Sequence, residues 1–336
     1  MRIRPKKAIF PLFFTMIILL VICLTGCGEI DKNSTKKVSH TGFYLDTVVT
    51  VSTYGYEDTG IIDECLKLCS EYELIFSRTD ERSELYRLND CGSMEVSDHL
   101  LSVLKTALEY CRISDGRFDI SMGAISAMYN FSSESPSLPS PEALESALAH
   151  VDYNNIIIDG NHVTFSDPET VIDLGSIAKG YIADQLKSFL LDNGIEHAII
   201  DLGGNILCVG GKPDGSNFRV GIQYPDKNSS KPITTVPLSD LSVVTSGAYQ
   251  RFFESDGRIY HHILDPETGM SVENDLLSVT IISASSTRCD ALSTVCFALG
   301  LEEGLAMING MDDTWAVFVT DDMEIHYSDG FEEKFA

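Results

Sequence analysis

The order of strand-type and helix-type segments constrains the fold of this chain more than any other feature of its sequence. A strand is expected over 43–54, where β-branched and aromatic residues gather, and amphipathic helices are expected over 60–73 and 97–111. A hairpin is expected to turn at Asp159-Gly160-Asn161. The segments lack the strictly repeated strand–helix–strand order that builds a parallel sheet. The sequence therefore predicts a single α+β domain over 42–336, with a mostly antiparallel sheet and packed helices.

The charge of the chain limits the partners it can have. Its 336 residues carry a net charge of -26, and nucleic-acid binding needs clustered Lys and Arg to meet the phosphates. Nucleic acid is therefore not expected as a partner. Of the nine cysteines, several fall on apolar faces of helix-type runs, which indicates small buried hydrophobic residues rather than a disulfide framework.

The first residues have the order of an export signal. Basic residues precede an apolar run over 8–23, and Leu24-Thr25-Gly26-Cys27 follows. This order resembles a bacterial lipobox, which predicts a signal peptide at 1–26, a lipid on Cys27 and a polar tether over 27–41. The alternative is an uncleaved membrane anchor, for which the apolar run is short. In both cases the rest of the chain lies on the extracytoplasmic face of the cell membrane.

A polar stretch at a strand-to-helix entry is the first candidate site. Asp173, Gly175, Ser176 and Lys179 follow a strand-type run and lead into a helix-type run that reaches about Leu191. Free backbone N–H groups and the positive end of a helix can face an anion at such an entry. The alternative is a buried lysine–aspartate pair at an ordinary turn.

A carboxylate and a hydroxyl share one face of a later helix. Asp290 and Thr294 are four residues apart, and the apolar residues of the run point elsewhere. Such oxygen ligands suit a hard cation that keeps waters, such as Mg²⁺. The alternative is an aspartate that interacts with the helix dipole, beside a surface threonine.

Two adjacent histidines lie in a strand expected over 258–264. Strand alternation places His261 and His262 on opposite faces, so one of them can face a site and act as a general base. The alternative for either residue is a hydrogen-bonded polar side chain at a strand edge.

These motifs together resemble one known family. They are Arg117-Phe118-Asp119, the run from Asp173 to Gly180, Leu202-Gly203-Gly204-Asn205, Thr245-Ser246-Gly247, His262-Ile263-Leu264-Asp265-Pro266 with Thr268-Gly269, and Asp290-Ala291-Leu292-Ser293-Thr294. They occur in the order found in the ApbE family of FAD:protein FMN transferases, and the resemblance spans about residues 42–327.

The resemblance implies an activity and a set of residues. Such enzymes bind FAD with Mg²⁺, cleave its pyrophosphate, pass FMN to a threonine or serine hydroxyl of a target flavoprotein and release AMP. The family pattern implies Mg²⁺ ligands at Asp290, Thr294 and the backbone carbonyl of Ser176. It implies an FAD site lined by Leu45, Arg117, Phe118, Asp119, Asp173, Lys179, Ile263 and Leu264. Lys179 is then expected to neutralise charge on the pyrophosphate, and His262 to deprotonate or orient the acceptor hydroxyl.

Two positions depart from the family pattern. Thr79 stands near a position where many members carry a tyrosine, and Ser293 stands where alanine is frequent. Some relatives hydrolyse FAD to FMN and AMP, so a Mg²⁺-dependent FAD pyrophosphatase is an alternative function. A non-catalytic flavin-binding lipoprotein is another. The sequence does not name the acceptor, for which an exported FMN-binding domain is expected.

Overall fold

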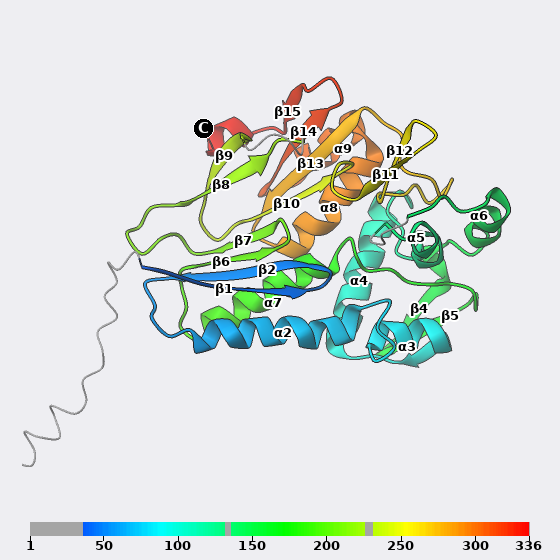
Figure 1. The fold of residues 1–336 in the computed structure, drawn as a ribbon, viewed down its shortest axis with the longest axis horizontal. Coiled ribbons are helices and arrows are strands. Elements are labelled where there is room, and N and C mark those ends of the chain that lie inside the picture. Colours follow the sequence, from blue (N-terminus) through cyan, green and yellow to red (C-terminus); the bar gives the residue numbers. More distant parts are fainter. Residues whose placement is uncertain (1–35, 132–135, 226–230, 336) are drawn as a thin grey trace, which may run out of the picture.

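An eight-stranded sheet organises the structure, a computed structural model that describes residues 36–131, 136–225 and 231–335 (Figure 1). Every neighbouring pair of strands in it is antiparallel. The strand order is β1 (Lys37–Tyr44), β2 (Thr47–Tyr54), β6 (Ala198–Leu202), β7 (Asn205–Val209), β10 (Ser242–Gly247), β13 (Leu276–Ser283), β14 (Thr314–Thr320) and β15 (Ile325–Tyr327). The predicted α+β class with a mostly antiparallel sheet is confirmed.

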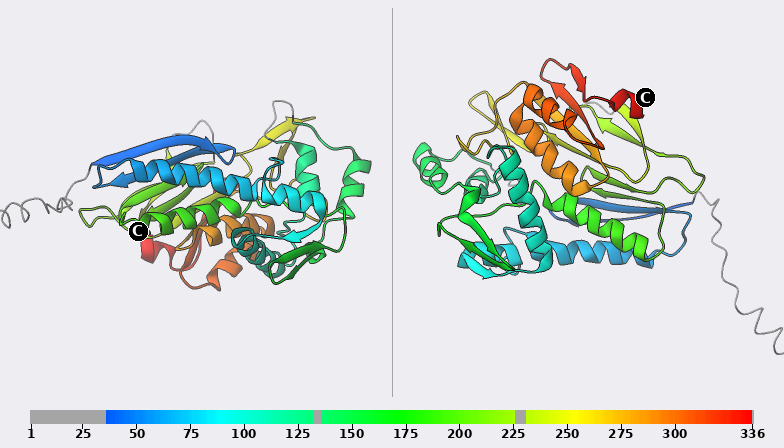
Figure 2. Two further views of the ribbon diagram at one scale, coloured as in Figure 1. Left: turned by 90° about the horizontal axis from the view of Figure 1, so that it is seen from below. Right: turned by 180° about the vertical axis from the view of Figure 1, so that it is seen from behind.

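The two faces of the sheet are covered differently, and strand alternation explains why. Val244 and Ile281 pack into an apolar cluster with helix α8 (Ser286–Leu299) and its neighbours. The adjacent residues of the same strands, Val243 and Ile282, pack with β8 (Phe218–Gln223), β9 (Pro232–Leu238) and α10 (Phe331–Phe335). Figure 2 shows α8, α2 (Gly60–Phe76), α7 (Ala178–Asp192) and α9 (Leu301–Asn309) on one side of the sheet. The sheet is therefore the middle layer.

The remaining elements lie beside this sheet. They are α3 (Glu84–Cys91), β3 (Ser93–Glu95), α4 (Asp98–Ile113), α5 (Gly123–Tyr129), α6 (Pro141–Leu148), η1 (Tyr153–Asn155), β4 (Ile156–Asp159), β5 (His162–Phe165), β11 (Phe252–Ser255) and β12 (Arg258–His261). The hairpin predicted to turn at 159–161 is confirmed as β4 and β5.

The first strand begins earlier than the sequence indicates. β1 starts at Lys37, within the stretch predicted as a tether, and a turn at Leu45-Asp46 separates it from β2. The strand expected over 43–54 is thus present from Thr47 as β2, but its expected start was wrong, because residues 43–46 belong to the end of β1 and to the turn. Both turn residues have positive φ, of 55° each, as a two-residue hairpin turn requires. β1 is a polar edge strand, so its sequence carries little of the apolar signal by which strands are recognised.

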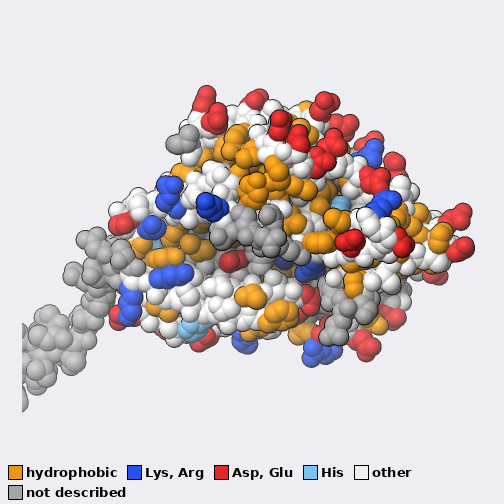
Figure 3. All heavy atoms as spheres, turned by 45° about the horizontal axis from the view of Figure 1, so that its top comes forward, with side chains coloured by type: hydrophobic (Ala, Val, Ile, Leu, Met, Phe, Trp, Pro, Cys, Tyr) orange, Lys and Arg blue, Asp and Glu red, His pale blue; other side chains and the backbone are white. Residues whose placement is uncertain are grey.

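The described surface has no strong basic patch on the face drawn in Figure 3. Acidic side chains gather along one border of that face, whereas Lys and Arg are scattered. No helix within 36–131, 136–225 or 231–335 has both the length and the apolar character needed to span a bilayer. The predicted signal peptide and Cys27 lie outside the described residues.

Candidate active site

The entry to α7 is built around the carboxylate of Asp173. Its Oδ1 atom accepts a hydrogen bond of 2.9 Å from the Gly175 amide, and its Oδ2 atom accepts one of 2.7 Å from the Ser126 hydroxyl. The Arg78 guanidinium lies 3.2 Å from the same Oδ2 atom. Asp173 therefore fixes the loop that leads to Lys179, rather than pairing with the lysine as the simpler alternative expected.

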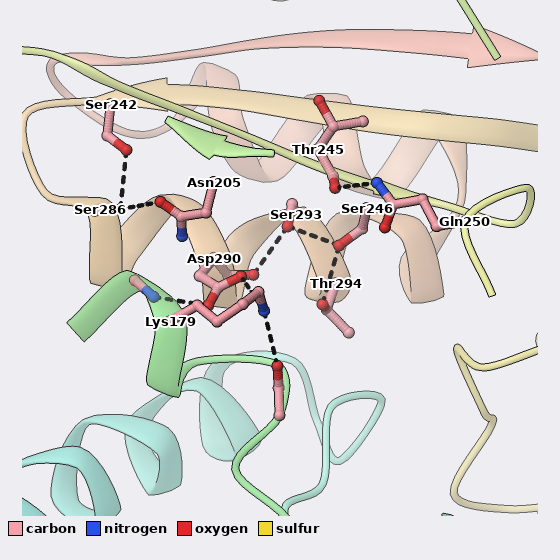
Figure 4. Close-up of polar contacts among 12 residues, drawn as sticks. Lys179, Asn205, Ser242, Thr245, Ser246, Gln250, Ser286, Asp290, Ser293 and Thr294 are labelled. Carbon is pink, nitrogen blue, oxygen red and sulfur yellow. Dashed lines mark hydrogen bonds and ion pairs between the residues drawn. The ribbon is translucent and has the colours of Figure 1, made fainter. Parts of the chain in front are cut away.

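Lys179 joins α7 to α8. Its Nζ atom donates to the Gly175 carbonyl at 3.1 Å and lies 3.5 Å from Oδ1 of Asp290. The other carboxylate oxygen, Oδ2, accepts a 2.9 Å bond from the Gly180 amide. Gly180 allows this approach, because a Cβ atom there would lie 2.3 Å from the Ser286 carbonyl oxygen. The helices thus meet at a point where an ammonium and a carboxylate face each other (Figure 4).

Asp184, also on α7, fixes the start of α8. Its carboxylate accepts hydrogen bonds from the amides of Ser286 and Thr287 at 2.8 and 2.9 Å, and from the Thr287 hydroxyl at 2.7 Å. The first amides of a helix have no partner within the helix, and a carboxylate there also interacts favourably with the helix dipole. Asp184 therefore sets the position of the helix that carries Asp290.

The middle of α8 carries the hydroxyl groups of the site. Thr294 is half-buried, and its Oγ1 atom lies 3.2 Å from the Ser246 hydroxyl of β10. Ser246 also lies 2.8 Å from the Ser293 hydroxyl. Ser293 is fully buried and donates to the Asp290 carbonyl at 2.9 Å. The Ser293 hydroxyl therefore makes its hydrogen bonds within α8 and with β10, rather than toward the open side of the site.

The oxygen donors fit a hard divalent cation. Asp290 supplies a carboxylate that is 6 % exposed, and Thr294 supplies a neutral hydroxyl one turn away on the same helix. Oxygen donors of this kind are the ligands that Mg²⁺ takes in proteins. In the described part of the chain no three His, Cys, Asp or Glu side chains cluster as a metal site. A cation here would thus keep water or substrate oxygens as further ligands.

His262 is held as a neutral imidazole. Burial lowers its pKa to about 3, and the nearby charge of Arg251 acts in the same direction. The residue as a whole is half-buried, but its Nδ1 atom is buried and has no hydrogen-bond partner among the described residues. The Nδ1 atom of His261 is likewise buried without a partner among the described residues, but its Nε2 atom lies 3.1 Å from the Val272 carbonyl and its backbone amide donates to the Ser271 hydroxyl. His261 is a structural residue.

The residues expected around the flavin lie in separate parts of the structure. Leu45 is in the β1–β2 turn, where its amide donates to Glu73. Arg117 is exposed and lines a small cavity with Asp265. Ile263 is buried, and Leu264 packs against the cluster formed by α5 and α6.

Phe118 and Asp119 have structural contacts of their own. Phe118 is buried in the main apolar core. The Asp119 carboxylate accepts bonds from the Ser121 amide and hydroxyl and from the Tyr153 amide. Burial raises the pKa of Asp119, and these hydrogen bonds oppose that shift.

Four residues of the site were not assigned a role from the sequence. They are Arg78, Ser126, Asp184 and Ser246. Each reaches its partner from a distant segment, as when Arg78 reaches Asp173 across 95 residues. Asp184 and Ser246 had a local signal, because Asp184 lies in the same stretch as Lys179 and Ser246 lies in the motif Thr245-Ser246-Gly247.

Comparisons with known proteins agree on one family. A profile of the ApbE family matches residues 45–319. An FAD:protein FMN transferase of Treponema pallidum is 32% identical over 342 residues, which cover 95% of this chain and 94% of that protein. One from Vibrio cholerae is 32% identical, and the match covers 93% of each chain.

Solved structures show the same likeness. The flavin transferase ApbE from Vibrio cholerae aligns with a TM-score of 0.81 and 26% identity, covering 90% of this chain and 99% of that one. The ApbE protein from Thermotoga maritima aligns with a TM-score of 0.83 and 30% identity, covering 90% of this chain and 100% of that one.

Proposed function

Because this chain belongs to the ApbE family, we propose that it uses Mg²⁺ to transfer FMN from FAD to a serine or threonine hydroxyl of a target flavoprotein, releasing AMP. Transfer of FMN from FAD to a target protein is the activity of this chain. The metal, the acceptor hydroxyl and the residue roles are the finer parts of the proposal.

The contact between Lys179 and Asp290 is the observation that supports these finer parts most. Residues 111 positions apart bring an ammonium and a nearly buried carboxylate to 3.5 Å, beside the Thr294 hydroxyl. A protein that only stored flavin would not need such a pair. Asp290, Thr294 and the Ser176 carbonyl would hold the cation, which when bound supplies Lewis-acid stabilisation of pyrophosphate oxygens.

The transfer breaks one bond and forms another at the same phosphorus. The acceptor oxygen bonds to the phosphorus of the FMN half, and the bond from that phosphorus to the bridging oxygen breaks. AMP leaves with the electron pair of that bond. Lys179 offsets the negative charge that develops on the phosphate oxygens, because a fixed cation in a partly desolvated site is already in place when that charge appears.

We assign to His262 the role of interacting with the proton of the acceptor hydroxyl. The neutral imidazole is the form that can accept a proton or a hydrogen bond from the acceptor hydroxyl, and burial favours this form. Because burial also makes the imidazole a weaker base, the role of orienting the hydroxyl stands beside that of deprotonating it. The Lys179 charge is among those that disfavour its protonation. The proton would be released to solvent or to AMP after transfer.

The flavin is proposed to contact residues from several loops. Leu45, Asp173 and the segment 117–119, which precede Lys179 in the sequence, would contribute contacts to the flavin. Ile263 and Leu264, which follow Lys179, would contribute further contacts. Asp173 contributes by holding the Lys179 loop in place.

The location is a proposal from the sequence alone. Cys27 would carry the lipid that holds the enzyme on the extracytoplasmic face of the cell membrane, with the segment after it as a short tether. The acceptor would then be an exported or membrane-bound protein with an FMN-binding domain.

One assay separates the three candidate functions. The purified chain is incubated with FAD and Mg²⁺, with and without an acceptor flavoprotein domain, and AMP, free FMN and protein-bound FMN are measured. A transferase gives AMP and protein-bound FMN only with acceptor. A pyrophosphatase gives free FMN without it, and a flavin carrier gives neither product.

A pair of variants tests the role of His262. We expect His262→Ala to lower transfer by about two to four orders of magnitude, the range for loss of a general base, while FAD still binds. His261→Ala is the matched control and is expected to keep transfer, because His261 bonds to Val272 within the fold. Transfer at the wild-type rate by His262→Ala would contradict the assignment.

A further inference from the structure

We propose that Ser246 and Ser293 are positioning residues that orient the Thr294 hydroxyl as a cation ligand. They do so through a chain of hydrogen bonds in which each hydroxyl donates its proton to the next group. This inference rests on the metal site of the proposed function and deepens it. Neither serine was assigned a role in the chemistry from the sequence.

The chain of hydroxyls is built between β10 and α8. The Ser293 hydroxyl lies 2.9 Å from the Asp290 carbonyl oxygen and 2.8 Å from the Ser246 hydroxyl. Ser246 lies 3.2 Å from Oγ1 of Thr294. Ser293 is fully buried and Ser246 is 9% exposed, so water competes little for these groups (Figure 4).

The direction of the chain follows from the number of protons available. A carbonyl oxygen only accepts, so Ser293 gives its single hydroxyl proton to Asp290. Ser293 must then accept the proton of Ser246. Ser246 has now used its own proton, and its bond with Thr294 forms only if Thr294 donates.

The consequence concerns the lone pairs of Thr294. A hydroxyl bound to a cation must offer oxygen, and its proton must point elsewhere. In this arrangement the Thr294 proton is committed to Ser246, and its lone pairs are left for the open side of the site. The hydroxyl is thus oriented before a cation arrives, as outer partners orient metal ligands in other sites.

The same chain connects the two cation ligands. It begins at the hydroxyl of Thr294 and ends at the backbone carbonyl of Asp290, whose side chain is the carboxylate ligand. Removing Ser293 would free the Ser246 proton to turn toward Thr294, which would then have to accept it.

A second hydroxyl chain on the same two elements provides a matched control. Ser242 of β10 donates to Ser286 of α8 at 2.9 Å, and both residues are fully buried. Ser286 in turn donates to the side-chain oxygen of Asn205, which is not a proposed cation ligand. Ser242→Ala therefore removes the same kind of group between the same elements without touching Thr294.

The test is a titration of the full-length chain, purified in detergent, with MgCl₂ alone by calorimetry. We expect Ser246→Ala and Ser293→Ala each to weaken Mg²⁺ binding by about 10- to 100-fold, the usual effect of losing an outer partner of a metal ligand. The double variant should bind no more weakly than Ser246→Ala, because Ser293 acts only through Ser246. Ser242→Ala should lower the melting temperature and leave Mg²⁺ affinity unchanged.

The outcomes separate this inference from the function on which it rests. Wild-type Mg²⁺ affinity in Ser246→Ala, losses that add fully in the double variant, or an equal loss in Ser242→Ala would each overturn the inference alone. No binding of Mg²⁺ by the wild-type chain would overturn the metal assignment and the inference together. Transfer by the wild-type chain, measured separately with FAD and acceptor, tests the proposed function itself.

Discussion

Lowering the pH should destabilise this protein through its buried histidines, and His262 has the larger pKa shift. Burial lowers its pKa from the ordinary 6.5 to about 3, so the folded protein keeps the imidazole neutral over the range in which the unfolded chain binds a proton. At pH values between these two pKa values, His262 binds more protons in the unfolded state than in the folded state. Stability therefore falls as the pH falls below about 6.5.

The size of the effect follows from the two pKa values. At about pH 7.5 both states are nearly neutral at this residue, and the contribution is close to zero. At about pH 5 the unfolded imidazole is mostly protonated and the folded one is not, which costs about 2 kcal/mol of unfolding free energy. That is a substantial part of the usual stability of a domain.

The assay compares wild type with His262→Gln, which cannot titrate. Urea unfolding is measured for both at about pH 7.5 and about pH 5, and circular dichroism at the higher pH shows that the variant folds. Other groups titrate alike in both proteins, so the difference between the two pH responses isolates His262. The wild type should lose about 2 kcal/mol more than the variant. An equal loss in both proteins would refute the neutral, buried imidazole.

Three further changes have defined outcomes. Asp290→Ala should nearly abolish Mg²⁺-dependent turnover of FAD while weakening FAD binding less, and wild-type turnover at ordinary Mg²⁺ would remove Asp290 from the metal site. Gly180→Ala should lower the unfolding free energy by about 1–3 kcal/mol, since the new Cβ atom would meet the Ser286 carbonyl, and an unchanged urea midpoint would contradict that packing. Cys27→Ala should leave a folded, active but mislocalised domain, and mass spectrometry that finds an unlipidated Cys27 in the native protein would argue against the anchor.

Local signals in the sequence predicted much of the fold. A helix was expected over 287–299, which α8 matches, and the hairpin at 159–161 was expected because Asp-Gly-Asn favours a tight turn. The edge strand β1 was missed, since a strand exposed along one side needs few apolar residues. The helix α6 was missed too, although Ser140 caps it and Pro141 opens it.

The candidate site was predictable only in part, for a related reason. Asp290 and Thr294 could be placed on one helix face by their spacing alone. Their partners could not, because Lys179 and Ser246 reach α8 from other elements. The resemblance to a known family supplied the grouping of these segments, which no spacing rule provides. The link from Arg78 to Asp173 had no local signal at all.

The carboxylate of Asp184 has a consequence for how the site moves. By capping α8 from within α7, it joins the helix that carries Lys179 to the one that carries Asp290. Neighbouring elements that are bonded together often open as one cooperative unit. Amide protons of both helices should therefore exchange with solvent at matching rates, and slowly. Substrates would then gain entry through motion of the surrounding loops, while the two helices stay together.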